Sequence, residues 1–226
     1  MNSLKFTMID YRIAKGQIKM LGFFFLVGVA FSLYIKSPLL GMSYMCFGSI
    51  VMSMVPFNLS QASSNGFLNM LPATALSRVI GRYLFSVMMS LAGVISGILC
   101  ALIVSRFTGE SMPGIAIIAV FVFLFSQICQ CIQYLMAYVL MPYQSQQVVI
   151  PLLRMVPAFL FWWLTSAYMD DLVNIANMSN LNALSIWLSA RGRIIAGLLL
   201  TAAVAVIGIV SVLISWQLIE KRDMGG

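Results

Sequence analysis

The stretch that decides the fold is residues 114–140, GIAIIAVFVFLFSQICQCIQYLMAYVL, an apolar run without a single charged residue. As an α-helix it would rise about 40 Å at 1.5 Å per residue. The hydrocarbon core of a bilayer is only about 30 Å thick. The run is therefore predicted to cross a membrane as one helix.

The rest of the chain has the same character. Five more apolar runs cover about residues 20–34, 39–58, 80–104, 148–169 and 194–216. Hydrophobic residues make up 62% of the 226 residues and charged residues only 8%, against about a quarter in soluble domains. We expect an all-α polytopic membrane protein, a single domain over residues 1–226 with six transmembrane helices between residues 20 and 216.

The net charge of +7 is explained by topology rather than by nucleic acid. The basic residues flank the apolar runs and form no patch with interleaved aromatics, so a nucleic-acid partner is not expected. With the N-terminus in the cytosol, nine Lys and Arg fall on the cytosolic side and four on the outer side. This count predicts that both termini are cytosolic.

Residues 1–19 are predicted to form an amphipathic helix on the inner membrane surface. Phe6, Ile9 and Ile13 share one helical face, and most of the basic residues of the segment lie elsewhere. The alternative is a disordered basic tail.

Several kinds of chemistry have no residues to support them. The chain has no histidine and no G-x-x-x-x-G-K-[ST] phosphate loop, so no catalytic centre, metal site or cofactor is expected in it. None of its six acidic residues lies in the middle of an apolar run. An ion-driven transporter usually needs such a buried ionisable group, and here only Arg154, near one end of a run, is available.

Polar residues inside the apolar runs suggest a route for a substrate. Gln127, Gln130 and Tyr134 fall on one helical face, and amides facing lipid are costly. They are candidates for lining a translocation path, with hydrogen bonding between helices as the alternative. Small residues at helical spacing in two runs predict close helix packing, either within one subunit or in a dimer. They are Ser86, Ser90, Gly93 and Gly97 in one run, and Gly197, Thr201, Ala205 and Gly208 in the other.

The most unusual segment is the predicted cytosolic loop 59–79. Phe67, Leu68 and Leu71 gather there outside any apolar run long enough to span. Exposed apolar side chains of this kind suggest a surface for a partner protein. The alternative is a helix that lies back on the membrane.

This loop resembles the region after the second span in ABC type-2 permeases. Leu71-Pro72-Ala73-Thr74 and Arg82-Tyr83-Leu84 match the family pattern in order and spacing, although Ala75 stands where a basic residue usually follows the Ser or Thr. The six spans, the amphipathic N-terminal segment and the short loops agree with it. The chain also resembles the permeases of exporters for phenol-soluble modulins and antimicrobial peptides, which are small members of this family.

The resemblance implies a mechanism and partners. The chain would be the permease subunit of an ATP-driven exporter in the bacterial plasma membrane, working with a second permease subunit and a separate ABC ATPase that holds ATP and Mg²⁺. Residues 170–193 would be an outer segment that dips toward the membrane. The residues expected to couple to the ATPase are Phe67, Leu68, Leu71, Pro72, Arg78 and Arg82. A stand-alone channel or carrier and a non-transporting scaffold remain the alternatives.

Overall fold

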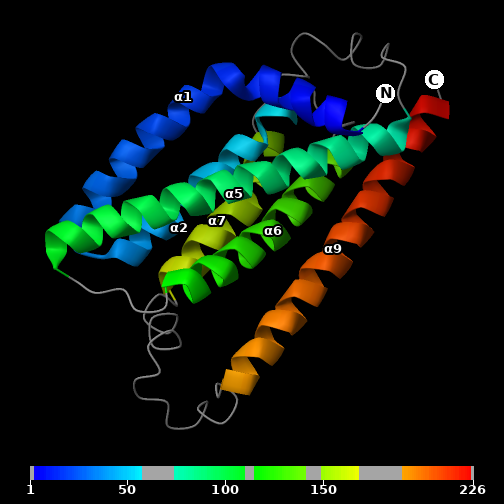
Figure 1. Ribbon diagram of the computed structural model, residues 1–226. Coiled ribbons are helices and arrows are strands. Elements are labelled where there is room, and N and C mark those ends of the chain that lie inside the picture. The colour runs from blue at the N-terminus through cyan, green and yellow to red at the C-terminus, as the bar shows by residue number, and fades with distance from the viewer. Residues whose placement is uncertain (1–2, 58–73, 110–114, 141–148, 168–189, 225–226) are drawn as a thin grey trace.

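A computed structural model describes residues 3–57, 74–109, 115–140, 149–167 and 190–224, and six α-helices run through these ranges (Figure 1). Each predicted apolar run falls in a helix of its own, which confirms the all-α polytopic fold. The helices are α1 (Ser3–Ile35), α2 (Pro38–Ser53), α5 (Ala75–Thr108), α6 (Ile115–Val139), α7 (Val149–Ala167) and α9 (Ala190–Met224).

The six predicted spans differ in how well their length fits a bilayer. By length and composition, four described helices can cross a membrane, over Pro38–Phe57, Ala75–Thr108, Ile115–Val139 and Gly197–Lys221. The two arms of α1 together supply a fifth candidate. The apolar part of α7, Leu152–Ala167, is shorter. Its place among the longer helices in Figure 1 nevertheless makes it part of the same bundle.

Helix α1 consists of two arms, Ser3–Gly16 and Lys19–Ile35, bent by 64° relative to each other (Figure 1). The first arm is the predicted N-terminal helix, and one of its faces is buried against the rest of the molecule. Ile9 and Ile13 are only partly buried. The arm packs against α5 through a face that includes polar side chains. This face consists of Phe6, Thr7, Asp10 and Ala14.

A tight turn joins α1 to α2 and begins the core of the bundle. Lys36 adopts a left-handed conformation with φ of 59°, and the backbone N–H of Ser37 donates to Ser32 O at 3.1 Å. Pro38 then opens α2 at a position where a missing N–H costs nothing. Helix α2 contacts α1, α5, α6 and α7, and most of its residues are buried. It is the central helix of the fold.

Small residues allow α5 to lie directly on α2. A Cβ added to Gly93 would stand 2.5 Å from the Cβ of Ser49, and one added to Gly97 would stand 3.1 Å from the Cα of Met42. The predicted packing within one subunit is confirmed for this helix. On α9 the predicted stripe is open at Gly197, where nothing lies within 4 Å of an added Cβ, whereas Cys131 Sγ lies 3.9 Å from a Cβ added to Gly208.

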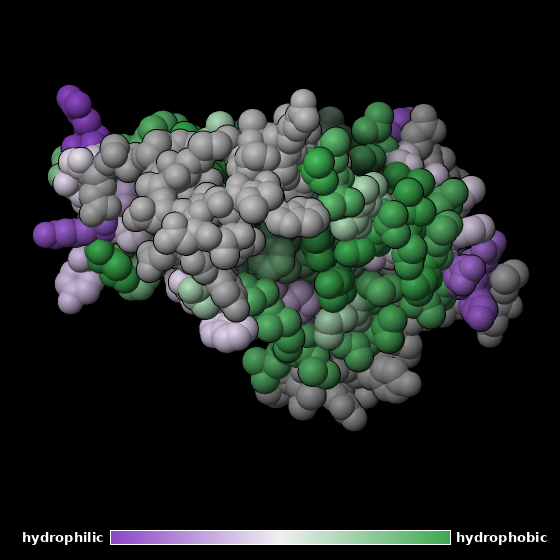
Figure 2. Space-filling model, turned by 90° about the horizontal axis from the view of Figure 1, so that it is seen from below, coloured by the Kyte–Doolittle hydropathy of each residue, from purple (hydrophilic) through white to green (hydrophobic). Residues whose placement is uncertain are grey.

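The surface carries an apolar band. Figure 2 shows hydrophobic side chains over the middle of the molecule and hydrophilic ones at two opposite ends. Large apolar side chains of α5 and α9 point outward in this band, among them Ile95 and Leu99 on α5 and Leu198 and Ile209 on α9. Such a surface is stable in lipid rather than in water.

Candidate functional site

The site begins at the first turns of α5, directly after residues 58–73. The hydroxyl of Thr74 accepts a hydrogen bond from the backbone N–H of Ser77 at 3.2 Å and caps the helix. Helix α5 therefore starts at Ala75, five residues before the predicted start of the span. This corrects the predicted loop 59–79, because its last residues are helical. Arg78 lies in the first turn of α5 and Arg82 in the second.

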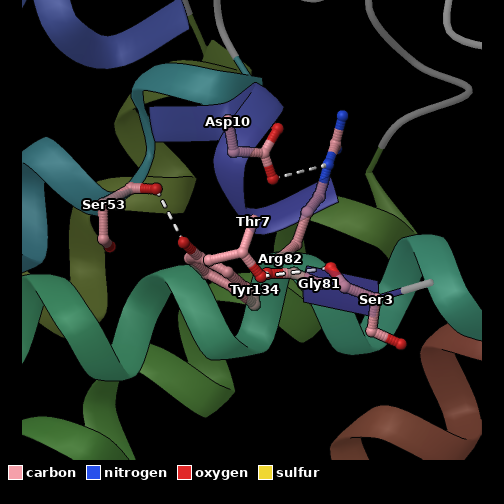
Figure 3. A network of polar contacts seen from close by, with 7 residues as sticks. All are labelled: Ser3, Thr7, Asp10, Ser53, Gly81, Arg82 and Tyr134. Atoms are coloured by element: carbon pink, nitrogen blue, oxygen red, sulfur yellow. Dashed lines mark hydrogen bonds and ion pairs between the residues drawn. The ribbon is translucent and has the colours of Figure 1, made fainter. Parts of the chain in front are cut away.

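Arg82 is the centre of a group of side chains from α1, α5, α6 and the segment just after α2. We call this group, Asp10, Phe57, Arg82, Tyr134 and Tyr138, the Arg82 cluster. The Arg82 guanidinium carbon lies 4.4 Å from the centroid of the Phe57 ring, close enough for a cation–π contact. Its Nε lies 3.9 Å from Asp10 Oδ2 (Figure 3). Only 13% of the Arg82 side chain is exposed, so both contacts are shielded from water.

The N-terminal arm is attached to α5 at the neighbouring residue. The Thr7 hydroxyl donates to the backbone carbonyl of Gly81 at 2.9 Å (Figure 3). Gly81 permits this approach because a Cβ there would stand 2.5 Å from the Cβ of Phe6 and 2.8 Å from Ser3 O. The arm and the start of α5 are thus held together by a backbone contact, a hydrogen bond and the ion pair of Asp10 with Arg82.

Asp10 is unusual for an acid on a basic segment, because its side chain is only 2% exposed. Burial raises its pKa to about 6 from an ordinary 3.8, although the Arg82 charge acts in the opposite direction. Desolvation therefore outweighs the ion pair. This result agrees with the long 3.9 Å separation and with the absence of a hydrogen-bond partner for Asp10 Oδ2 among the described residues.

Aromatic rings extend the Arg82 cluster into the bundle. The Phe57 ring meets those of Tyr134 and Tyr138 edge to face at centroid distances of 4.9 and 5.1 Å. The Tyr134 hydroxyl donates to Ser53 O at 2.7 Å and caps the last carbonyl of α2 (Figure 3). Tyr83 meets the Tyr134 ring at 5.3 Å and also reaches α9 through its hydroxyl. These contacts connect the start of α5 to α1, α2, α6 and α9.

Residues 8–220 match the family of ABC-2 family transporter proteins. The chain belongs to this family. No curated protein and no solved structure matches it significantly. As a family member it is a multi-pass membrane protein and a permease component of an ABC transporter, and such components are generally not catalytic.

The structure places only part of the predicted site of this ABC-2 permease. Phe67, Leu68, Leu71 and Pro72 lie outside the described residues. Arg78 and Arg82 lie on α5, Arg82 in the cluster described above. The predicted path residues Gln127, Gln130 and Tyr134 are all buried on α6. Tyr134 connects the predicted path to the predicted coupling residues, because its ring packs against Tyr83, the neighbour of Arg82 in the chain.

Sequence reasoning missed Asp10, Thr7 and Phe57. Asp10 is the only acid in the first twenty residues. A single acid among basic residues could have indicated that its side chain has a specific partner. The signal for Phe57 was weaker, because an aromatic residue at the end of an apolar run is ordinary. The contact of Thr7 with Gly81 depends on the bend of α1, which the sequence pattern does not specify.

Proposed function

We propose that this ABC-2 permease is the membrane subunit of an ATP-driven exporter whose energy enters beside the start of α5. The observation that carries the proposal is the Arg82 cluster. Its side chains connect the helix that follows residues 59–73 to Tyr134 on the predicted path. An ATPase that docks on Phe67, Leu68, Leu71 and Pro72 would pull on α5 first, and the cluster would carry the displacement to α2 and α6.

The proposal includes the partners that this arrangement requires. ATP and Mg²⁺ would be held by a separate ABC ATPase, and a second permease subunit would complete the pathway. The open surface at Gly197 on α9 gives a second copy or lipid room to approach. Both termini would lie in the cytosol of a bacterial cell, and the substrates would be amphipathic or antimicrobial peptides, such as phenol-soluble modulins.

A stand-alone ion-driven carrier is less well supported. Between Lys19 and Ile219 the described helices contain no Asp or Glu. A carrier coupled to protons or cations usually binds its ion at such a group inside the membrane. The lack of one in the described helices favours an external energy source.

The test is co-purification with the partner ATPase and measurement of its ATP hydrolysis in liposomes. Leu71→Asp and Phe67→Asp should abolish both complex formation and stimulation, because they place a charge in the apolar docking surface. Phe107→Asp is the matched control, since Phe107 is 76% exposed at the opposite end of α5. Arg82→Gln should leave the complex intact and lower the stimulation.

Two results would contradict the proposal. One is an unchanged ATPase complex and unchanged hydrolysis in the Leu71 and Phe67 variants. The other is transport of an amphipathic peptide by the purified chain in liposomes without any ATPase, which would support the stand-alone channel or carrier. A chain that binds the ATPase but moves no substrate would indicate a scaffold.

A further inference from the structure

Helices α6 and α7 hold buried polar atoms that have no partner among the described residues. Gln130 is fully buried, and neither its amide oxygen nor its amide nitrogen is hydrogen-bonded. The same is true of Gln127 Nε2 and Gln133 Oε1. Arg154 on α7 is 2% exposed, and its Nε and Nη2 have no partner. Buried polar groups are nearly always paired, so this concentration requires an explanation.

Two contacts fix the register of α6 against α7. Phe125 stacks on Phe161 at a centroid distance of 5.5 Å, and Gln133 Nε2 lies 3.8 Å from Met155 Sδ. The helices are therefore antiparallel, with Arg154 level with Gln133. Gln130 lies about one helical turn further from that end of the bundle, and Gln127 about two turns. The residues with unpartnered atoms therefore follow one another along the bundle from the level of Arg154, and we call them the polar tract.

Arg154 is the member of this tract that needs a counter-charge. A guanidinium stays protonated in proteins, so it cannot escape burial by losing its charge. Between Lys19 and Ile219 the described helices offer no carboxylate. Asp10, the buried acid of the arm, faces Arg82 instead. Water can satisfy an amide, but only an anion neutralises a buried guanidinium.

The free atoms also define the shape of the ligand group. Nε and Nη2 form one edge of the guanidinium and present two parallel N–H groups, the arrangement that binds a carboxylate or phosphate with two hydrogen bonds. Gln130 and Gln127 add further N–H donors along the tract. Phe125 and Phe161, which stack on each other, supply apolar and aromatic surface where α6 and α7 meet.

We propose that Arg154 and the glutamines of α6 bind the acidic group of an amphipathic ligand. The chemistry is an oxyanion carried on an apolar body. Its source is either the carboxylate of an exported amphipathic peptide or the phosphate of a membrane lipid. The proposal rests on the function proposed above, since it assigns a chemical class to the substrate of the same path.

The first experiment measures binding to the purified chain in phosphatidylcholine nanodiscs, without ATPase. The probe is a fluorescent amphipathic helical peptide whose only acid is its terminal carboxylate, compared with its C-terminal amide by anisotropy. Wild type should bind the free acid about tenfold more tightly or better, the size expected for a charge-assisted hydrogen bond. Arg154→Gln should remove this preference, and Arg154→Lys should keep part of it.

A second arm identifies lipid as the source. Native mass spectrometry compares retention of phosphatidylglycerol and phosphatidylcholine by wild type and by Arg154→Gln. Loss of phosphatidylglycerol retention alone assigns the site to a lipid, and loss of the peptide preference alone assigns it to the substrate. Arg106→Gln on α5 is the control, because it removes an exposed arginine from a spanning helix and should change neither reading.

Thermal unfolding separates a ligand site from a structural role. A buried charge without a counter-charge destabilises the ligand-free protein. Ligand-free Arg154→Gln should therefore unfold at the same temperature as wild type or at a higher one. The proposal is overturned if Arg154→Gln alters neither the peptide preference nor lipid retention, or if it unfolds several degrees lower with binding unchanged. Because no ATPase is present, these outcomes do not depend on whether the docking variants behave as expected.

Discussion

The buried carboxyl of Asp10 predicts that the N-terminal arm is held more tightly in mild acid than at neutral pH. Folding raises the pKa of Asp10 from 3.8 to about 6. An acid whose pKa is raised contributes most stability below its unfolded pKa and loses it as the pH rises through the folded value. The expected loss therefore begins near pH 4 and is complete somewhat above pH 6.

The size of the effect follows from the two pKa values. Burying the carboxyl costs about 1.6 kcal/mol near pH 5 and about 3 kcal/mol near pH 7.5. The arm should thus be less stable by about 1.4 kcal/mol at the higher pH, which is about a tenfold change in its opening equilibrium. Because Arg82 lowers the pKa of Asp10, Arg82→Gln should move the loss of stability to still higher pH.

Hydrogen exchange of the arm, Ser3–Gly16, measures this opening directly, since local unfolding exposes its helical amides. After correction for the intrinsic exchange rate, wild-type protection should fall about tenfold from pH 5 to pH 7.5, and Asp10→Asn should abolish the dependence. Glu220→Gln on α9 matches the change in net charge and should keep the wild-type slope. Protection that rises with pH, or a slope unaltered in Asp10→Asn, would refute the reasoning.

Three other substitutions test the packing around the site. Gly93→Ala should lower the free energy of unfolding by about 1–3 kcal/mol in a denaturation assay, because the new Cβ meets Ser49. Gly197→Ala has open space around it and should be neutral or slightly stabilising in the same assay. Tyr134→Phe should cost about 0.5–1.5 kcal/mol and lower ATPase stimulation, since it leaves a carbonyl of α2 without its donor; unchanged stimulation would argue against the cluster as a link. Thr74→Ala should fray the first turn of α5 at a cost of about 1 kcal/mol, seen as faster hydrogen exchange there and nowhere else in α5.

The fold could be predicted because lipid imposes strong rules on sequence. A run such as residues 114–140 has no stable alternative to a helix in a bilayer, since every backbone polar group must be satisfied within the segment. The helix ends were less certain. Helix α5 begins at Ala75 rather than near residue 80, because the Thr74 cap lies outside the apolar run from which the span was predicted.

The sequence predicted which residues belong to the candidate site, but not which of them contact one another. Gln127, Gln130, Tyr134 and Arg82 stood out as polar groups in or beside apolar runs. What Arg82 contacts depends on the bend of α1, which brings Asp10 to a residue 72 positions away. Hydropathy carries no information about that bend.

The two buried arginines show why such pairings matter. Both lie on apolar helices and would look alike in a hydropathy plot. Arg82 has an acid, an aromatic face and tyrosines around it, so its charge is used within the protein and suits a mechanical link. Arg154 has two N–H groups without a described partner. We therefore propose that its charge binds the acidic group of a ligand. In the mechanism we propose, Arg82 would connect the helices and Arg154 would recognise the ligand that passes between them.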